Sequence, residues 1–428
     1  MSALIDRTDR FAVIGAGFSG LGVMAAMQRR GVEFDAFEAD DEVGGNWYHG
    51  VYETVHIISS RKTTEYDDWP MPADWPDFPS KDQMLSYLRG YADHHRLREK
   101  IAFATTVQRL VPAGDGQWEL TLPSGERRLY GGVVVAIGHH WQKRWPHYPG
   151  EFTGEMIHSK DYKAPERLRG KRVLVIGGGN SACDIAVEAA RFSESAHISV
   201  RRGYWFMPKT MFGVPTVEFI KPWMPLWSQR LLLRGLIRVI VGKYSDYGLP
   251  EPDHPIFEHH PTINSELLYY IRHGRISPHP DVARWDGEYA EFTDGRRERF
   301  DLVVCATGYD LGFPFLEDDV IRWDGRGMPD LIDGLVSPRH KNIYFFGNSQ
   351  PRYGAGPLIS AGAELLCTMI EVQRQLKAPI GRLLQRLGHK PPRTWVADPI
   401  EILKNTRRGR KLLPRLARYE RWLVPDAV

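Results

Sequence analysis

The sequence predicts an α/β protein with two interleaved Rossmann-like dinucleotide-binding domains, the first of which is discontinuous in the chain. Two glycine fingerprints lead to this prediction, GAGFSG at 15–20 and GGGNSA at 177–182. Each follows a short apolar run typical of a buried strand, Phe11–Ile14 or Val173–Ile176, and each leads into a helical pattern. The first amides of such a helix can hold a pyrophosphate. One glycine turn can also serve ordinary α/β packing, but the pair predicts two nucleotide sites.

The residues that follow each fingerprint distinguish the two nucleotides. Glu38 ends the second predicted strand, Val32–Phe37, where a carboxylate can accept hydrogen bonds from ribose hydroxyls. Arg201 and Arg202 end the equivalent strand of the second unit, His197–Val200, where guanidinium groups suit a 2′-phosphate. We therefore expect FAD at the first fingerprint and NADPH at the second.

The order of the apolar strands predicts where one domain interrupts the other. GGVVVAIG at 131–138 returns to the first sheet, DLVVCATGY at 301–309 leads back from the second unit, and NIYFFGNS at 342–349 gives a last buried strand. We expect an FAD-binding domain and an inserted NADPH-binding domain that carries a long helical insertion of its own. The predicted boundaries are 1–149 and 307–428 for FAD, 150–306 for NADPH, and about 203–261 for the insertion.

The expected cofactor contacts gather at the glycine turns, at the strand ends and in the segment EVGGNWYHG, whose glycines allow the backbone to approach a flat ligand closely. A helix that opens at Gly356 would also aim its amides at an anionic group. The residues predicted to bind the cofactors are Gly15, Gly17, Phe18, Ser19, Gly20, Glu38, Gly45, Asn46, Trp47, Val107, Gly177, Gly179, Asn180, Ser181, Arg201, Arg202 and Asn348.

Composition excludes several other classes of protein. A net charge of +3 over 428 residues is too small to indicate nucleic-acid binding. The three cysteines form no CxxC pair, which argues against a disulfide reductase. We find no serine or cysteine triad and no histidine spacing typical of a metal site, so we expect no metal. The polar N-terminus MSALIDRTDR resembles no signal peptide, which predicts a cytoplasmic protein.

Two segments of the sequence are both basic and amphipathic. In Pro222–Tyr244, Arg230, Arg234 and Arg238 recur every four residues, so a membrane-spanning helix is disfavoured. We expect this helix to pack as a lid over the substrate path, with peripheral contact to a membrane surface as the alternative. The segment Arg407–Arg421 is interpreted as a solvated closing helix. A homodimer is possible from the sequence.

The linker between the two predicted domains carries a distinctive motif. Phe152, Gly154, His158 and Tyr162 match the pattern F-x-G-x-x-x-H-S-x-x-Y, and the sequence thereby resembles the flavin-containing monooxygenases. The Baeyer–Villiger relatives continue this motif toward a Trp-Pro or Trp-Asp pair, where Tyr162 stands here. Further family marks, which together cover most of the chain, are GGNW at 44–47, EYDDWPMPADWPDFPS at 65–80, GGGNSACD at 177–184 and ATGY at 306–309.

The resemblance implies an NADPH-dependent flavoprotein monooxygenase. Its implied partners are O₂ and a small-molecule substrate, and one oxygen atom would pass from a flavin C4a-hydroperoxide to a nucleophilic nitrogen or sulfur. The alternatives are a Baeyer–Villiger enzyme that acts on ketones, an uncoupled NADPH oxidase that releases H₂O₂, and a non-catalytic redox sensor. The linker residues are expected to couple the domains, so His158 is not assigned a catalytic role.

One position departs from the family pattern. The resemblance implies an asparagine beside the reactive flavin, three residues before a lysine or a similar residue. Counting back from Lys62 places Ser59 there, and Ser59 is therefore the predicted catalytic residue. Because a serine hydroxyl is shorter than an amide and offers one donor instead of two, we expect weaker protection of the peroxide and some leakage of H₂O₂.

Overall fold

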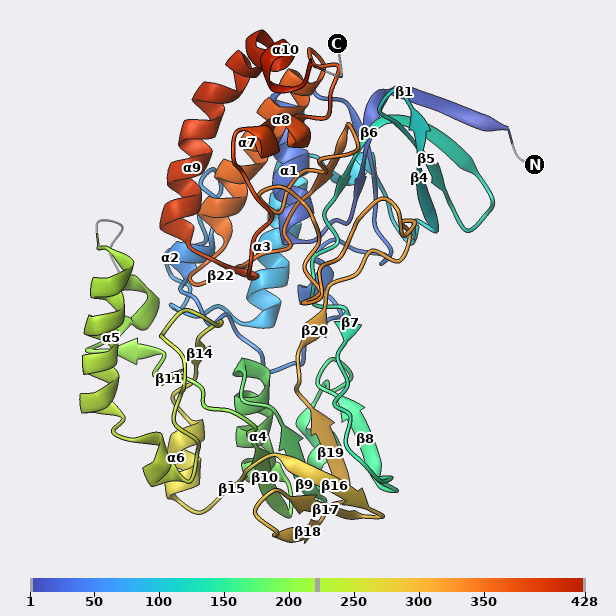
Figure 1. The fold of residues 1–428 in the computed structure, drawn as a ribbon. Helices are drawn as coiled ribbons and strands as arrows, with labels where there is room; N and C mark the ends of the chain where they lie inside the picture. Colours follow the sequence, from blue (N-terminus) through green and yellow to red (C-terminus); the bar gives the residue numbers. More distant parts are fainter. Residues whose placement is uncertain (1–2, 220–223, 426–428) are drawn as a thin grey trace.

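The protein is built around two separate sheets, seen here in a computed structural model that describes residues 3–219 and 224–425 (Figure 1). The upper lobe of Figure 1 holds the first sheet, in the order β3-β2-β1-β6-β5-β4, with β21 also paired to β6. Strands β4 to β6 form an antiparallel meander, and the other pairings are parallel. The strands are β1 (Leu4–Ile14), β2 (Phe34–Phe37), β3 (Ile101–Ala102), β4 (Arg109–Gly114), β5 (Gln117–Thr121), β6 (Arg127–Val135) and β21 (Ile343–Phe345).

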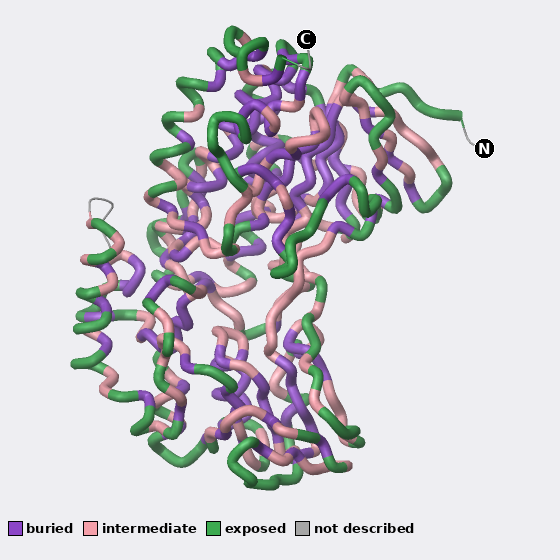
Figure 2. Tube along the Cα trace, viewed as in Figure 1, coloured by how far each residue is buried: buried purple, intermediate pink, exposed green. Residues whose placement is uncertain are grey.

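Helices cover one face of the first sheet, while the β4–β5 strands and residues 313–331 cover the other, so the central strands are apolar on both faces. The last four residues of β1 and of β6 are all buried, whereas β1 begins exposed (Figure 2). The helices of this lobe are α1 (Phe18–Arg29), α2 (Arg61–Thr64), α3 (Lys81–His94), α7 (Gly356–Gln373), α8 (Ile380–Arg386), α9 (Pro399–Leu412) and α10 (Glu420–Leu423).

The second sheet forms the lower lobe and is parallel throughout, in the order β15-β10-β9-β19-β8. Helix α4 packs on β9 and β10, and a small three-stranded sheet of β16, β17 and β18 covers the other face. The elements are β8 (Glu155–His158), β9 (Arg172–Ile176), α4 (Asn180–Phe192), β10 (Ser195–Ser199), α6 (Leu267–Arg272), β15 (Ser277–His279), β16 (Val282–Asp286), β17 (Tyr289–Phe292), β18 (Arg297–Arg299) and β19 (Leu302–Cys305).

The insertion of the second lobe carries one long helix, α5, and several two-residue strands. Gln229, Leu233 and Ile237 form the buried face of α5, while Trp227 and Leu231 are 69% and 68% exposed. No residue of α5 lines the main cavity, so the structure does not support the expected lid. Residues 222 and 223 of the predicted helix lie outside the described residues. The elements are β11 (Phe206–Met207), β12 (Thr210–Met211), β13 (Val214–Pro215), α5 (Leu226–Ile240) and β14 (Thr262–Ile263).

The chain passes between the lobes beside one short antiparallel pair, β7 (Gln142–Lys143) with β20 (Tyr309–Asp310) (Figure 1). A further connection comes from residues 52–58, which precede α2 in the first lobe. Tyr52 is buried in the apolar core of the second lobe, and Val55 and Ile58 pack against that core. We call residues 52–58 the strap.

Val107 lies in a loop between two strands of the first sheet, because β3 ends at Ala102 and β4 begins at Arg109. Only Leu110 of β4 is fully buried, so this edge strand has little apolar periodicity. A short parallel pair, β22 (Gln350–Pro351) with β23 (Val396–Ala397), joins the chain before α7 to the chain before α9.

Cys183, Cys305 and Cys367 are free thiols with no exposed surface. Burial raises the pKa of Cys305 and of Cys367 to about 12, and raises the pKa of Cys183 well above its usual value. Among the described residues, no helix is long and apolar enough to cross a membrane.

Candidate active site

A cavity of about 2340 Å³ extends between the two lobes and along the first. Pockets for single small molecules usually measure about 300–1,000 Å³, so this cavity has room for more than one ligand. Both glycine turns open into it, together with the ends of β1, β6 and β9. The two predicted nucleotide sites therefore share one cavity.

The first glycine turn leaves backbone amides free at the cavity. Gly15 has φ +102°, and a Cβ there would lie 2.7 Å from the carbonyl oxygen of Ala136. Gly17 caps α1 without any side-chain hydrogen bond to the first helical amides. A Cβ on Gly17 would stand 3.6 Å from Cα of Gly45, in the gap between the two glycine segments. This gap fits a pyrophosphate at the start of α1.

Glu38 lines the cavity at the end of β2 and is 7% exposed. Its carboxylate accepts a hydrogen bond of 2.6 Å from the amide of Ala16 and one of 3.1 Å from the amide of Asp40. Burial raises its pKa, although these amide bonds oppose the shift. Glu38 thus fixes the glycine turn, and each oxygen retains a second lone pair for a ribose hydroxyl.

The second turn repeats this arrangement. Gly177 has φ +137°, and Gly179 caps α4 with no side-chain partner. A Cβ on Gly179 would meet no atom within 4 Å, so the space before α4 is open. A Cβ on Gly178 would meet the ring of Tyr204 at 2.4 Å, because this ring lies over the turn. Asn180 is held by the neighbouring chain, since its side chain accepts from the amide of Ile263.

Arg201 and Arg202 are exposed at the cavity wall, just after β10. Neither forms an ion pair with a carboxylate within residues 3–219 and 224–425. Arg202 contacts Nε2 of His259 at 3.3 Å and lies over the ring of Tyr204. Two guanidinium groups without acidic partners fit the dianionic 2′-phosphate of NADPH.

The space between the turns is lined by the GGNW segment and by residues just after β21. Asn348 is 5% exposed, and neither its amide nitrogen nor its carbonyl oxygen has a hydrogen-bond partner among the described residues. The side-chain oxygen of Asn46 is also buried without a partner. Unpaired buried amides are costly, so their presence at one cavity fits a polar ligand such as a flavin ring edge.

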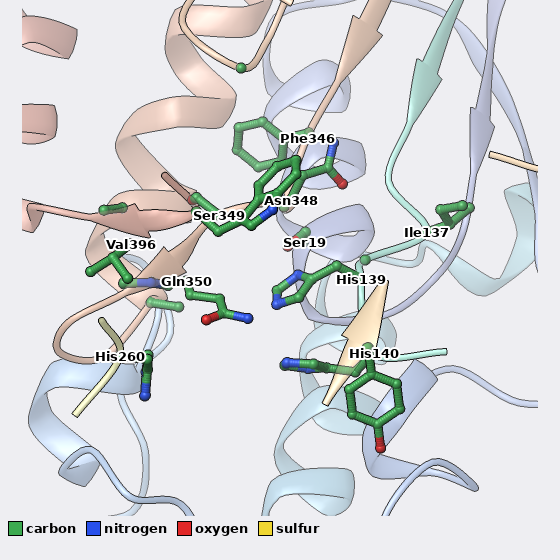
Figure 3. A pocket seen from close by; sticks show the side chains of 18 of the residues that line it. Ser19, Ile137, His139, His140, His260, Phe346, Asn348, Ser349, Gln350 and Val396 are labelled. Atoms are coloured by element: carbon green, nitrogen blue, oxygen red, sulfur yellow. The ribbon is translucent and has the colours of Figure 1, made fainter. Parts of the chain in front are cut away.

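Three histidines that sequence reasoning did not single out for this site surround the same space (Figure 3). His139 and His140 follow β6, and His260 comes from the end of the insertion. Burial lowers the pKa of all three, and lowers that of His139 to about 4, so the rings are neutral near pH 7. The sequence Gly138-His139-His140 directly follows a predicted buried strand, and this position could have indicated that His139 and His140 lie at the site.

Ser59 does not reach the cavity. Its hydroxyl lies 2.7 Å from the hydroxyl of Thr64, and the residue of this segment that lines the cavity is Ile58. Counting three residues back from Arg61 instead of Lys62 gives Ile58, so the sequence prediction of Ser59 was displaced by one residue. The position holds an apolar side chain that offers no hydrogen bond.

Most of the remaining predicted contacts do line the cavity, and Gly20 is the exception. A Cβ on Gly20 would lie 2.0 Å from the carbonyl oxygen of Gly15, so this glycine allows close packing within the turn. The predicted residues that line the cavity are Gly15, Gly17, Phe18, Ser19, Glu38, Gly45, Asn46, Trp47, Val107, Gly177, Gly179, Asn180, Ser181, Arg201, Arg202 and Asn348.

His158 connects the two passages between the lobes. Its Nε2 donates to the carbonyl oxygen of Gly308 at 3.0 Å, and its Nδ1 accepts from the amide of Lys160 at 3.1 Å. Burial lowers its pKa, so the ring is neutral at pH 7 and carries its proton on Nε2. The side chain is fully buried and points into this junction, which suits a role in positioning.

Comparison with known proteins agrees with this geometry. The model of the family described as flavin-binding monooxygenase-like matches residues 8–328. Flavin-containing monooxygenase 5 of Oryctolagus cuniculus is 35% identical over 340 residues, 73% of this chain and 64% of the relative. The relative named dimethylaniline monooxygenase [N-oxide-forming] 2, from the same species, is 33% identical over 391 residues, 83% of this chain and 72% of its own length. The chain thus spans 64% of the length of the first of these relatives.

Solved structures show the same fold. A flavin-containing monooxygenase from Stenotrophomonas maltophilia superposes with a TM-score of 0.66 at 22% identity, covering 85% of this chain and 98% of its own. A cyclohexanone monooxygenase reaches a TM-score of 0.75 at 17% identity, covering 96% and 98%. With the family match over most of the chain and two glycine turns at one cavity, the chain belongs to the flavin-binding monooxygenase-like family, whose cofactors are FAD and NADPH.

Proposed function

We propose that this protein is an NADPH-dependent monooxygenase that transfers one oxygen atom of O₂ to a nucleophilic nitrogen or sulfur of a small molecule. The observation that carries the proposal is the meeting of two uncapped helix N-termini in one cavity, with Glu38 beside one and Arg201 and Arg202 beside the other. That arrangement suits one nucleotide without a 2′-phosphate and one with it. The names of the relatives, one of them N-oxide-forming, support the choice of heteroatom.

The chain's own residues bind and orient the reactants. When bound, FAD and NADPH supply hydride transfer and the activation of O₂. The open amides at Gly17 and Gly179 hold the pyrophosphates, and the two arginines hold the 2′-phosphate. The amide group of Asn348 and the side-chain oxygen of Asn46, both without partners, would hold the edge of the flavin. The neutral rings of His139 and His140 line the cavity without adding a charge.

A product test distinguishes the proposal from ketone oxygenation. The purified enzyme, NADPH and O₂ are incubated with thioanisole and, separately, with cyclohexanone. Sulfoxide formation with little lactone supports the proposal. Lactone without sulfoxide contradicts it and favours a Baeyer–Villiger enzyme. Rapid bleaching of the flavin by NADPH, followed in a stopped-flow instrument, checks that the protein is catalytic and not a nucleotide-binding sensor.

A second function, an NADPH oxidase that releases H₂O₂, is favoured by Ile58. An apolar side chain replaces the amide that the family pattern places at this part of the cavity, and hydrogen bonds to a reactive oxygen species slow its loss. The ratio of O₂ consumed to product formed decides between the two. A ratio close to one with a good substrate supports the monooxygenase, and a ratio far above one with every substrate supports the oxidase.

Ile58→Asn gives a matched test within the same protein. Restoring an amide at this position is expected to lower H₂O₂ release relative to the wild type while flavin reduction continues at the wild-type rate. Horseradish-peroxidase-coupled fluorescence measures the H₂O₂. Ser59→Asn is the control, because Ser59 does not line the cavity and the leak is expected to stay unchanged.

A cytoplasmic location, a homodimer and peripheral membrane contact remain proposals. The outer face of α5 supports membrane contact, since Trp227 and Leu231 are exposed together with Arg234 and Arg238. Co-sedimentation with vesicles of phosphatidylcholine and phosphatidylserine tests it. Loss of binding in Trp227→Ala would support the contact, and absence of binding by the wild type would contradict it.

A further inference from the structure

The end of the insertion folds back onto the strand end that carries the two arginines of the second nucleotide site. Gly203 directly follows these arginines, and a Cβ there would lie 2.2 Å from the carbonyl oxygen of Glu251. The indole Nε1 of Trp205 donates a hydrogen bond of 2.9 Å to the carbonyl oxygen of His254. Residues 251–259 are therefore held against the loop that follows β10, although they come from the far end of the insertion.

His259 is the residue of this segment that meets Arg202. Nε2 of the histidine lies 3.3 Å from Nη1 of the arginine, and both residues line the main cavity. A guanidinium group can only donate hydrogen bonds, so Nε2 accepts here and the neutral ring carries its proton on Nδ1. A histidine at this place was not predicted, because it is distant in the sequence from the glycine turn.

The groups around His259 keep its ring neutral near pH 7. The ring of His254 packs edge-on, with 4.6 Å between the ring centroids, and Nδ1 of His254 lies 3.1 Å from a carboxylate oxygen of Asp253. Glu258 is the other carboxylate that acts on the ring. Burial, the charge of Arg202 and the neighbouring His254 lower the pKa of His259 and outweigh the two carboxylates.

A phosphate group beside this ring would reverse that balance. Negative charges within about 4–6 Å favour the protonated form of a histidine. Once a phosphate oxygen accepts the hydrogen bond of Arg202, Nε2 of His259 loses its donor and can bind a proton from the solvent. The protonated ring then donates to another phosphate oxygen, and such a charge-assisted hydrogen bond is stronger than a neutral one. No bond of the phosphate ester changes, and the complex gains one proton.

We propose that His259 is a third ligand of the 2′-phosphate of NADPH, beside Arg201 and Arg202, and that its ring takes up a proton when the coenzyme binds. The insertion thereby contributes to coenzyme selectivity, since NADH offers no 2′-phosphate to this ring. Binding of NADPH becomes tighter as the pH falls from alkaline values toward 7, and binding of NADH does not. The inference rests on the use of NADPH in the proposed function and is independent of the substrate.

Isothermal titration calorimetry of the FAD-loaded protein tests the proton uptake without turnover. The probes are adenosine 2′,5′-bisphosphate and adenosine 5′-monophosphate at pH 7.5, where a phosphate monoester is dianionic because its second pKa is about 6. Titrations in buffers of different ionisation enthalpy, none of them phosphate, give the number of protons bound. The wild type is expected to take up about one more proton with the bisphosphate than with the monophosphate.

His259→Asn removes both the charge and the titrating group. It is expected to bind the bisphosphate about tenfold more weakly than the wild type, because one charge-assisted hydrogen bond is lost, and to take up no extra proton. His273→Asn, on the exposed end of α6, is the matched control and is expected to behave as the wild type.

His259→Lys separates the charge from its titration, since an ammonium group stays protonated in this pH range. This variant is expected to bind the bisphosphate about as tightly as the wild type without any extra proton. Between pH 7 and 8.5 its affinity is expected to stay constant, whereas the affinity of the wild type falls by up to about tenfold per pH unit.

Three results overturn the inference. Two of them are equal proton uptake with both probes in the wild type, and the same extra uptake in His259→Asn as in the wild type. The third is a wild type that binds the bisphosphate no more tightly than the monophosphate, which also contradicts the placement of NADPH at this site. If His259→Asn melts well below the wild type, the proton uptake of His259→Lys decides alone. No substrate is oxygenated in these measurements, so failure of the proposed oxygenation leaves the inference in place.

Discussion

Cofactor selectivity in this protein is assigned to single side chains at equivalent strand ends. Glu38 is buried and holds the first glycine turn through two amide hydrogen bonds, whereas Arg201 and Arg202 stand exposed without acidic partners among the described residues. A carboxylate at the first position repels a 2′-phosphate, and guanidinium groups at the second attract it. The two turns can thus be similar in backbone and still select different nucleotides.

Arg201→Ala is expected to raise the KM for NADPH by about 10- to 100-fold, since hydrogen bonds to charged groups contribute about 1.5–3 kcal/mol. The KM for NADH is expected to change little. Steady-state oxidation of each nucleotide measures the effect. Arg284→Ala, which removes an exposed arginine on β16, serves as the control. An unchanged preference for NADPH in Arg201→Ala would contradict the assignment of the 2′-phosphate.

His197, which is half-buried, and His279, which is 3% exposed, form a pair on the sheet of the second lobe, with 2.9 Å between Nδ1 of His197 and Nε2 of His279. Burial and the neighbouring charges of His197 and Arg296 lower the pKa of His279 to about 3, below the value of about 6.5 in an unfolded chain. The unfolded state therefore binds more protons between these values. The contribution of His279 to the free energy of unfolding is therefore fully present above pH 6.5 and is lost as the pH drops toward 3.

His279→Gln is expected to flatten this dependence of the unfolding free energy between about pH 6.5 and 4, because one proton-binding difference is removed. Urea unfolding followed by circular dichroism at several pH values measures the slope. His273→Gln, on the exposed end of α6, is the control. A slope that stays as steep in His279→Gln as in the wild type would disprove this origin.

At the scale of elements, the strap joins the first lobe to α4. Glu188 of α4 is 5% exposed and accepts hydrogen bonds from the hydroxyls of Thr54 in the strap and Tyr162 in the linker. Asp184, one turn earlier, accepts from the hydroxyl of Tyr52 at 2.8 Å. The same strap ends at Ile58 in the cavity. The position of α4 is therefore coupled to one wall of the active site.

Glu188→Gln is expected to slow flavin reduction by NADPH by about tenfold, because small errors in the placement of the reacting groups have large effects on rate. The amide has one acceptor oxygen for two hydroxyl donors, so the strap is held less firmly. Stopped-flow absorbance measures flavin reduction at saturating NADPH. The KM for NADPH is expected to stay close to that of the wild type. Glu194→Gln, exposed beyond the end of α4, is the control. Wild-type reduction in Glu188→Gln would show that the strap does not position the cofactors.

The elements also show what could be predicted from the sequence. The glycine turns, the apolar strands around them and the helix at Gly356 depend on local patterns, and the structure contains each of them. Contacts between distant segments were not predictable, since no local pattern indicates that the inner face of α9 lies against α7. The displacement from Ser59 to Ile58 has a similar cause, because loop geometry decides which of two adjacent residues faces a cavity.

At the scale of the whole molecule, the chain passes twice between the two lobes, and His158 lies where these two passages meet. The ring binds the carbonyl oxygen of Gly308, so it ties the outgoing passage of the chain to the returning one. Trp145 and Tyr309 pack edge-on against the same ring. The relative position of the lobes, and with it the distance between the two cofactors, depends on this junction.

His158→Ala is expected to slow hydride transfer from NADPH by about tenfold or more while FAD remains bound, because the two lobes are no longer held in a fixed relative position. Reduction of the same variant by dithionite is expected at the wild-type rate, since it needs no second lobe. The two rates are measured by flavin absorbance. Equal loss with both reductants would point instead to damage at the flavin site.

The sealed position of the three cysteines has a consequence for an enzyme that handles O₂. Oxidation by peroxide requires a thiolate that the oxidant can reach, and here the thiols have no exposed surface and raised pKa values. Any H₂O₂ that escapes from the cavity would find no sulfenic-acid chemistry available on these residues. These three thiols are thereby shielded from peroxide, and a thiol reagent such as Ellman's should label them only after unfolding.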